Sequence, residues 1–201
     1  MRRKQIFLIA FSCIIANISY AQVTVIPSLG MSRSFSEYTE FSQPGFNAGV
    51  LFDFPFPKKS WSFQTGICSN NLKMNEWGNY TRIIGGKSIT FDDGRTSRYN
   101  FLEIPANLVK RVGLSEDANL YFTGGAYLGI FLSGEDLLRS SNGISDYALF
   151  HAYDADYVHL GFMIGTGVEI HKVLIGFDLN LNATDYYPLG FNWKLKVGYR
   201  F

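Results

Sequence analysis

The last eleven residues of the chain constrain its fold more than any other segment. From Phe191 to Phe201, every odd position is apolar or aromatic, and every even position is polar, charged or glycine. Because successive side chains of a β-strand point to opposite faces, this alternation predicts a strand with one apolar face and one face carrying Lys194, Lys196 and Arg200. A soluble β-sandwich can contain one such strand. A membrane-spanning β-barrel needs the pattern in every strand, over about 9–11 residues.

The same alternation recurs upstream and predicts seven further strands. They cover about residues 23–34, 46–54, 61–68, 102–108, 120–132, 158–170 and 173–182. The apolar phase changes from even to odd positions between Ile170 and Val173, as a two-residue hairpin at His171-Lys172 would produce. Pro105 removes a backbone donor from the middle of one strand, so we expect a β-bulge there.

The predicted connections alternate between long and short. Long ones cover about residues 35–44, 72–98, 134–155 and 183–190, and short ones lie near 55–59, 113–119 and 171–172. Short periplasmic turns and longer outer loops are typical of outer-membrane barrels. The sequence therefore predicts an all-β fold, an eight-stranded antiparallel transmembrane β-barrel with short periplasmic turns and long extracellular loops.

The N-terminus predicts export from the cytoplasm. Arg2, Arg3 and Lys4 precede an uncharged apolar run from Ile6 to Ile18, and small residues follow. This pattern is that of a secretory signal peptide, residues 1–21, cleaved after Ala21. The run is shorter than the roughly 20 apolar residues that a transmembrane helix needs. Residues 22–201 are then expected to form one barrel domain.

Composition agrees with a surface that meets lipid. Charged residues make up 17% of the chain, below the roughly 25% of soluble domains, and aromatic residues make up 16%. Without the three basic residues of the signal peptide, 15 of the 18 basic residues remain against 17 acidic ones, a net charge of −2. We therefore expect no nucleic-acid partner. Cys68 is the one cysteine left after cleavage, so it is expected to be a small buried residue of a strand.

The inward face of the predicted barrel is rich in charge. An eight-stranded barrel is just wide enough for its side chains to fill the interior. We expect Glu103, Glu169 and Asp178 to neutralise Lys194, Lys196 and Arg200, which would plug the lumen; a narrow conduction path is the alternative. Ten side chains are predicted to point inward: Asp53, Gln64, Glu103, Asn107, Glu169, Asp178, Asn180, Lys194, Lys196 and Arg200. Inward glycines are expected to make room for Tyr127, Met163 and the long basic chains.

The outward face is uncharged over most of its length. This distinguishes the chain from a soluble ligand-binding barrel, whose apolar face points inward. A Lys or Arg at mid-bilayer would cost about 2–4 kcal/mol. Aromatic residues near the strand ends are expected to form a girdle at the periplasmic interface: Phe54, Trp61, Phe122, Tyr199 and Phe201.

The sequence offers no support for catalysis. The three histidines lack the spacing of a metal site, and Gly-x-Ser-x-Gly and Cys–His arrangements are absent. A lipid-modifying pair of His151 with Ser140, and a weak calcium site at Asp154 and Asp156, are alternatives to solvated loop residues. We favour the solvated loops. The chain is thus predicted to be no enzyme and to use no cofactor or metal.

Three segments resemble a known family. They are Tyr99–Lys110, which contains Leu-Glu-Ile-Pro, Tyr127–Gly134, which begins Tyr-Leu-Gly, and the closing Gly198-Tyr199-Arg200-Phe201. Together with the signal peptide, they resemble the outer-membrane β-barrel family of Bacteroidetes-type bacteria, which includes the PorT-like proteins. The resemblance implies location in the bacterial outer membrane. It also implies that Tyr199 and Phe201 form the signal read by the barrel-assembly machinery.

We therefore expect an integral outer-membrane barrel in contact with outer-membrane lipid, with a structural or interaction role through its extracellular loops. One alternative is a PorT-like accessory component of a type IX secretion system, with secretion-system components as partners. The other is a secreted soluble ligand-binding barrel. Loop aromatics are candidates for partner contact, or for packing over the barrel mouth: Trp77, Tyr80, Tyr147, Phe150, His151 and Tyr153.

Overall fold

The computed structural model describes residues 23–35, 44–57, 60–76, 78–92, 94–140, 145–151, 158–183 and 191–201. The predicted signal peptide lies outside these residues. Within them there are eleven strands: β1 (Thr24–Phe35), β2 (Gly45–Pro55), β3 (Trp61–Glu76), β4 (Tyr80–Ile84), β5 (Lys87–Phe91), β6 (Arg95–Gly113), β7 (Ala118–Arg139), β8 (Ser145–His151), β9 (Val158–Ile170), β10 (Val173–Asn182) and β11 (Phe191–Tyr199).

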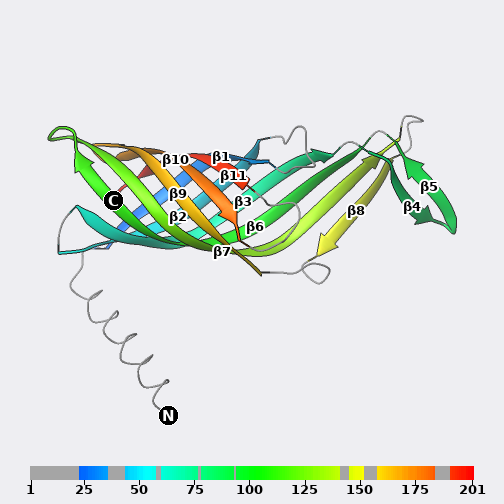
Figure 1. The fold of residues 1–201 in the computed structure, drawn as a ribbon, viewed down its shortest axis with the longest axis horizontal. Helices are drawn as coiled ribbons and strands as arrows, with labels where there is room; N and C mark the ends of the chain where they lie inside the picture. The colour runs from blue at the N-terminus through cyan, green and yellow to red at the C-terminus, as the bar shows by residue number, and fades with distance from the viewer. Residues whose placement is uncertain are drawn as a thin grey trace, which may run out of the picture.

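Eight of these strands form a closed antiparallel ring in the order β6-β3-β2-β1-β11-β10-β9-β7, which the pairing of β6 with β7 completes. The last strand pairs with the first, with Ser28 opposite Gly198 and Phe35 opposite Phe191. Every ring strand thus has a partner on both sides, which removes the exposed sheet edges that hydrocarbon would not tolerate. The predicted eight-stranded barrel is confirmed (Figure 1).

The predicted hairpin between β9 and β10 is confirmed. Ile170 pairs with Val173, and His171 takes a φ of 55° in the turn. A positive φ is uncommon for a residue other than glycine, but two-residue hairpins require it because their twist must match that of the strands.

The predicted bulge at Pro105 is not found. Pro105 does not form a bulge: Thr65 opposite Ala106 and Cys68 opposite Glu103 keep one register across it. The bulge lies further out, where Asn100 pairs with Ser133 but Phe101 pairs with Phe131, so that Leu132 is the extra residue of β7. A missing donor weakens one ladder contact without adding a residue, and only an added residue makes a bulge.

The segments 72–98 and 134–155, expected to be loops, are largely strand. They contain the outer ends of β3, β6 and β7, the β4–β5 hairpin and β8, which pairs with β7 from Ser133 opposite His151 to Arg139 opposite Ser145. Alternation fails to reveal them because both faces of these segments lie outside the lipid and carry polar residues. No helix within the described ranges is both long and apolar enough to cross a membrane.

A row of outward polar side chains marks the outer limit of the apolar belt. Asn71 Nδ2 donates to Asn100 Oδ1 at 2.6 Å, and Asn100 Nδ2 donates to Ser133 Oγ at 2.9 Å. The inner limit lies at Lys110, whose Nζ stands 5.0 Å from the centre of the Trp61 ring. Asn100 and Lys110 are about 33 Å apart along β6, hence about 25 Å along the membrane normal at the usual strand tilt, as for other barrels.

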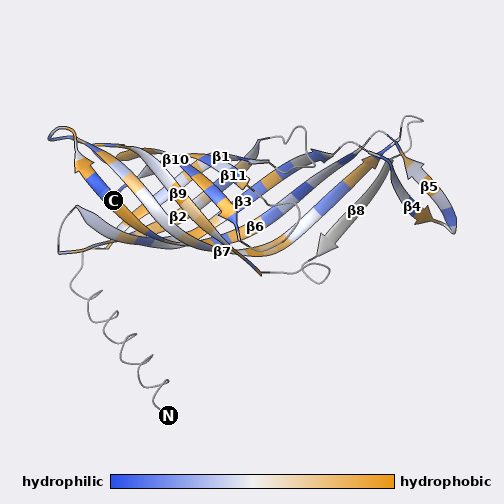
Figure 2. Cartoon of the chain, in the orientation of Figure 1, coloured by the Kyte–Doolittle hydropathy of each residue, from blue (hydrophilic) through white to orange (hydrophobic). Residues whose placement is uncertain are grey.

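The belt between these limits is built of exposed apolar side chains. Figure 2 shows them alternating with polar residues along the barrel strands, whereas polar residues gather at the outer ends of β3 and β6. Of the predicted girdle, Trp61, Phe122, Tyr199 and Phe201 are exposed at the periplasmic ends of their strands. Exposed members of the belt include Leu29, Met31, Phe46, Val50, Ile67, Leu108, Phe162, Ile164, Ile175, Leu195 and Val197.

Candidate functional site

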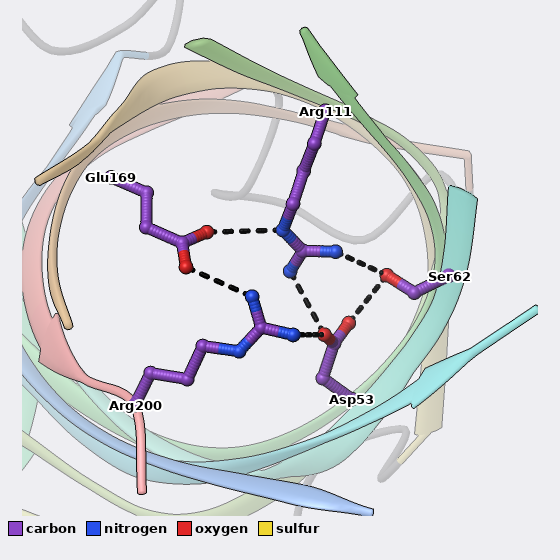
Figure 3. A network of polar contacts seen from close by, with 5 residues as sticks. All are labelled: Asp53, Ser62, Arg111, Glu169 and Arg200. Carbon is purple, nitrogen blue, oxygen red and sulfur yellow. Dashed lines mark hydrogen bonds and ion pairs between the residues drawn. The ribbon is translucent and has the colours of Figure 1, made fainter. Parts of the chain in front are cut away.

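Five side chains form a network across the periplasmic end of the lumen, which we call the periplasmic plug: Asp53, Ser62, Arg111, Glu169 and Arg200 (Figure 3). The Arg111 guanidinium donates to Asp53 Oδ2 at 2.9 Å, Glu169 Oε2 at 3.0 Å and Ser62 Oγ at 2.8 Å. Arg200 donates to Glu169 Oε1 at 2.8 Å and Asp53 Oδ2 at 3.1 Å. Four strands, β2, β3, β6 and β9, and the residue after β11 are thereby joined across the lumen.

The periplasmic plug is buried and electrically neutral. The Asp53 side chain is fully buried, and those of Glu169 and Arg111 are 4% and 8% exposed. Two guanidinium groups balance two carboxylates, and Ser62 Oγ donates a further bond of 2.5 Å to Asp53 Oδ1. Complete pairing is what makes buried charges tolerable, because an unpaired ion in a dry interior costs several kcal/mol.

Turn geometry places these groups together. Asp53 and Ser62 flank the short β2–β3 connection, and the Arg111 backbone N–H donates to the carbonyl of Ser60 at 2.7 Å. Arg111 is not among the predicted lumen residues, because the predicted strand 102–108 ends before it, whereas β6 continues to Gly113. Extending the inward phase of Glu103 and Asn107 by four residues would have found it.

An apolar layer lies next to the periplasmic plug inside the lumen. Its five side chains are buried and in mutual contact: Ile26, Leu51, Val109, Tyr121 and Leu174. Apart from the Tyr121 hydroxyl, this layer carries no side-chain group that could replace the hydration shell of an ion.

Two further ion pairs occupy the middle of the lumen. Lys196 Nζ lies 2.6 Å from Asp178 Oδ2, and Lys194 Nζ pairs with Glu103 Oε2. Asn70 Nδ2 donates to the other oxygen of Glu103 at 2.9 Å, and Ser32 Oγ donates to Asn70 Oδ1 at 2.8 Å. All of these side chains point inward. Other buried amides of the lumen, among them Asn107 Oδ1 and both polar atoms of Asn180, have no hydrogen-bond partner among the described residues.

Aromatic side chains close the outer part of the lumen; this outer aromatic layer consists of Phe101, Tyr127, Phe131 and His159. The His159 ring meets Phe101 edge-on at 5.1 Å and Tyr127 at 5.7 Å between ring centres. Phe101 meets Phe131 at 5.5 Å. These are the offset and edge-on distances that aromatic pairs favour.

Inward glycines make room for these large side chains. A Cβ at Gly161 would overlap the Tyr127 ring, and one at Gly129 would overlap His159. Gly176 leaves space in the same way for the hydroxyl of Tyr121. The prediction is thus confirmed for Tyr127, whereas His159 and Tyr121 were not foreseen.

Seven of the ten predicted lumen residues form ion pairs in three groups, and the other three, Gln64, Asn107 and Asn180, are buried. Asp53, Glu169 and Arg200 meet in the periplasmic plug, Lys196 meets Asp178, and Lys194 meets Glu103. Tyr199 and Phe201 point outward, with ring centres 4.9 Å apart. Cys68, which was expected to be buried in a strand, is a free thiol on the inward face of β3 and is only partly buried.

The structure gives little support to the two alternative sites predicted at the outer surface, the lipid-modifying pair and the calcium site. Ser140 Oγ donates to Asp92 Oδ1 at 3.0 Å, and His151 ends β8. Within the described ranges, His, Cys, Asp and Glu nowhere gather in threes that could hold a metal ion. Trp77, Tyr153, Asp154 and Asp156 lie outside the described residues.

Comparison with solved structures finds Ail, the attachment invasion locus protein of Yersinia pestis. Its crystal structure aligns with a TM-score of 0.41 and 15% identity, over 90% of this chain and 99% of that chain. The complex of Ail with the heparin analogue sucrose octasulfate gives 0.41 and 14%, over 89% and 97%. Ail in a phospholipid bilayer nanodisc gives 0.35 and 19%, over 89% and 99%.

No curated protein matches the chain. A family model described as outer membrane protein beta-barrel domain matches residues 15–201, which include every described strand. With its closed ring, apolar belt and filled lumen, the chain belongs to the family of outer membrane protein beta-barrel domains.

Proposed function

We propose that this barrel does not conduct solutes and that it acts as a structural or interaction protein through its extracellular parts. The observation that carries the proposal is the filling of the lumen. The periplasmic plug, the apolar layer, two ion pairs and the outer aromatic layer follow one another along the barrel axis. This order of paired and apolar layers along the axis supports a closed lumen without catalytic machinery.

The outer sheet supports the second half of the proposal. β7 has 22 residues, whereas a membrane-spanning strand needs about 9–11. The residues of β6 and β7 that exceed this length continue beyond the row of Asn71, Asn100 and Ser133, where β8 extends the sheet. Ordered segments outside the membrane, carried on a rigid barrel, are where binding groups are usually found.

Planar-bilayer recording tests the closed lumen. The purified barrel should insert without producing steady current steps. The double substitution Asp53→Ala and Arg200→Ala, which shortens two side chains of the periplasmic plug, serves as a comparison because the apolar and outer aromatic layers should still block ions. A steady, large conductance of the natural protein would contradict the proposal.

The soluble ligand-binding alternative is not retained. Its apolar face would point inward, whereas the exposed side chains of this barrel are apolar and the lumen holds the charges. A role as a PorT-like accessory of type IX secretion stays an alternative, supported by the resemblance of Tyr99–Lys110 and Gly198–Phe201. Cross-linking in cells followed by purification should then recover secretion-system components. Recovery of unrelated surface proteins would favour the general interaction role.

Export and assembly belong to the same proposal. Cleavage after Ala21 is expected to leave Gln22 as the first residue, which N-terminal sequencing of the outer-membrane protein would verify. Phe201 is exposed, and its backbone N–H donates to the carbonyl of Val25 at 3.0 Å. An exposed terminal aromatic on the closing strand suits recognition by the barrel-assembly machinery.

A further inference from the structure

The β4–β5 hairpin is a separate two-stranded sheet outside the barrel ring. Its register runs from Tyr80 opposite Phe91 to Ile84 opposite Lys87. Gly85 and Gly86 form the turn with φ values of 57° and 78°. Two successive positive φ values define the tight turn that glycine adopts without strain, so the position of the hairpin tip relative to its strands is fixed.

The base of the hairpin is fastened to the outer sheet. Phe91 is fully buried, and the Arg95 guanidinium lies 5.2 Å from the centre of the Tyr80 ring. Arg95 Nη1 also lies 3.5 Å from Asp136 Oδ2, and Ser97 Oγ donates to Asp136 Oδ1 at 2.5 Å. The hairpin is therefore a positioned projection. It follows the outer end of β3, beyond the polar row at Asn100, and Figure 1 shows it at the end of the molecule away from the C-terminus.

The tip of this projection is apolar and basic. Ile83 is 76% exposed and Ile84 37% exposed, and because they are consecutive in a strand they point to opposite faces. Both faces of the tip are thus apolar next to the turn. Arg82 and Lys87 flank the pair, and no acidic residue occurs from Gly78 to Phe91.

We propose that the tip of the β4–β5 hairpin docks into the interface of an anionic phospholipid bilayer other than the one that the barrel spans. The inference rests on the proposed function, because it needs an outer surface made for contact. A sulfated polymer would use the basic groups but leave Ile83 and Ile84 in water. An anionic bilayer uses both, since apolar side chains enter the boundary of headgroups and acyl chains while Lys87 meets lipid phosphate.

Vesicle sedimentation tests the inference on the whole barrel, held in nanodiscs of phosphatidylcholine. Dense vesicles containing phosphatidylglycerol should pellet the natural protein, and vesicles of phosphatidylcholine alone should pellet less of it. The double substitution Ile83→Ser and Ile84→Ser should lower the bound fraction about tenfold, as expected for losing two interfacial apolar side chains. Lys87→Gln should lower binding to the anionic vesicles only.

A matched control lies on the same hairpin. Thr81→Ser and Thr90→Ser change a cross-strand pair whose hydroxyls are 3.4 Å apart, and should leave binding unchanged. A heat-modifiable gel shift verifies the folded barrel in each variant. Equal sedimentation of the Ile83 and Ile84 variant and the natural protein would overturn bilayer docking. Loss with Lys87→Gln alone would likewise overturn it, because it would show adsorption by charge without insertion of the apolar side chains.

The proposed function fails by a different result. If the hairpin variants bind vesicles like the natural protein while recordings show a closed lumen, only bilayer docking is refuted. If the barrel conducts steadily, the proposed function is refuted whatever the vesicles show.

Discussion

At the residue scale, Arg111 and Asp53 are the two side chains of the periplasmic plug that each have three partners in it, and Arg111 is the cation of the two. Its three partners come from β2, β3 and β9. A planar guanidinium offers five donors in a fixed fork, so one side chain can bond two carboxylates and a hydroxyl at once. A lysine at the same position would supply the charge but not this geometry.

Replacing Arg111 by Met should destabilise the barrel by about 3–5 kcal/mol, because Asp53 and Glu169 would then share one cation in a buried site. Arg111→Lys should recover part of the loss. Urea unfolding in detergent, followed by the heat-modifiable gel shift, measures the effect. Lys110→Met, on the neighbouring outward position beside Trp61, is the matched control and should cost no more than about 1 kcal/mol. Equal losses for the two Met variants would contradict the role given to Arg111.

How far these contacts follow from the sequence differs between residues. Alternation places Lys194, Lys196 and Arg200 on the inward face without any structure. It cannot say which acid each one meets, because the pairing depends on the stagger of the closed barrel. Lys194 reaches Glu103 on β6, whereas Lys196 meets Asp178 on the adjacent β10.

At the scale of the element, strands inside the belt were predictable and those outside it were not. Lipid on one side and lumen on the other impose the period of two that identifies β9, β10 and β11. Beyond the polar row at Asn100, the outward face no longer meets lipid and carries polar residues, so the period of two is lost although Leu72 and Leu138 are buried there. β8 and the β4–β5 hairpin lie in this region. Turn chemistry offered one clue, since Gly85-Gly86 is a strong hairpin signal between two short β-prone segments.

The inward glycines lead to a prediction about packing within single strands. Gly161→Ala on β9 should destabilise the barrel by about 1–3 kcal/mol, because its Cβ would overlap the ring of Tyr127 and force it to move. Gly124→Ala on β7 is the control, since no atom lies within 4 Å of its Cβ position. Unfolding midpoints in urea compare the two. A Gly161→Ala variant as stable as Gly124→Ala would show that Tyr127 has room to spare.

The closing strand makes a second element-scale prediction. Deleting Phe201 should reduce insertion into the outer membrane in cells, because β11 must pair with β1 to remove the sheet edge and the terminal aromatic is the expected assembly signal. Crossing of the inner membrane should be unaffected. The readout is the amount of heat-shifted barrel in outer-membrane fractions. An unchanged amount would refute the assembly signal.

At the scale of the whole molecule, the outward and inward faces have exchanged the roles that they have in a soluble protein. Apolar side chains cover the outside between Asn100 and Lys110, while paired charges and aromatic rings fill the inside. The outward arrangement would be unfavourable in water, because monomeric soluble proteins rarely expose contiguous apolar surfaces. The bilayer is therefore part of what stabilises the fold, and depth in the bilayer should decide what an outward substitution costs.

Two outward positions of β9 test this dependence directly. Val158 and Ile164 are 55% and 57% exposed on the same face of one strand, so water alone would treat an arginine at either position alike. In a bilayer, Ile164 lies midway along β9 (Val158–Ile170), and Ile164→Arg should cost about 2–4 kcal/mol, against about 0–1 kcal/mol for Val158→Arg near the outer interface. Reversible unfolding from phospholipid vesicles measures both values. Equal costs would mean that β9 does not cross the membrane at the depth assigned by Asn100 and Lys110.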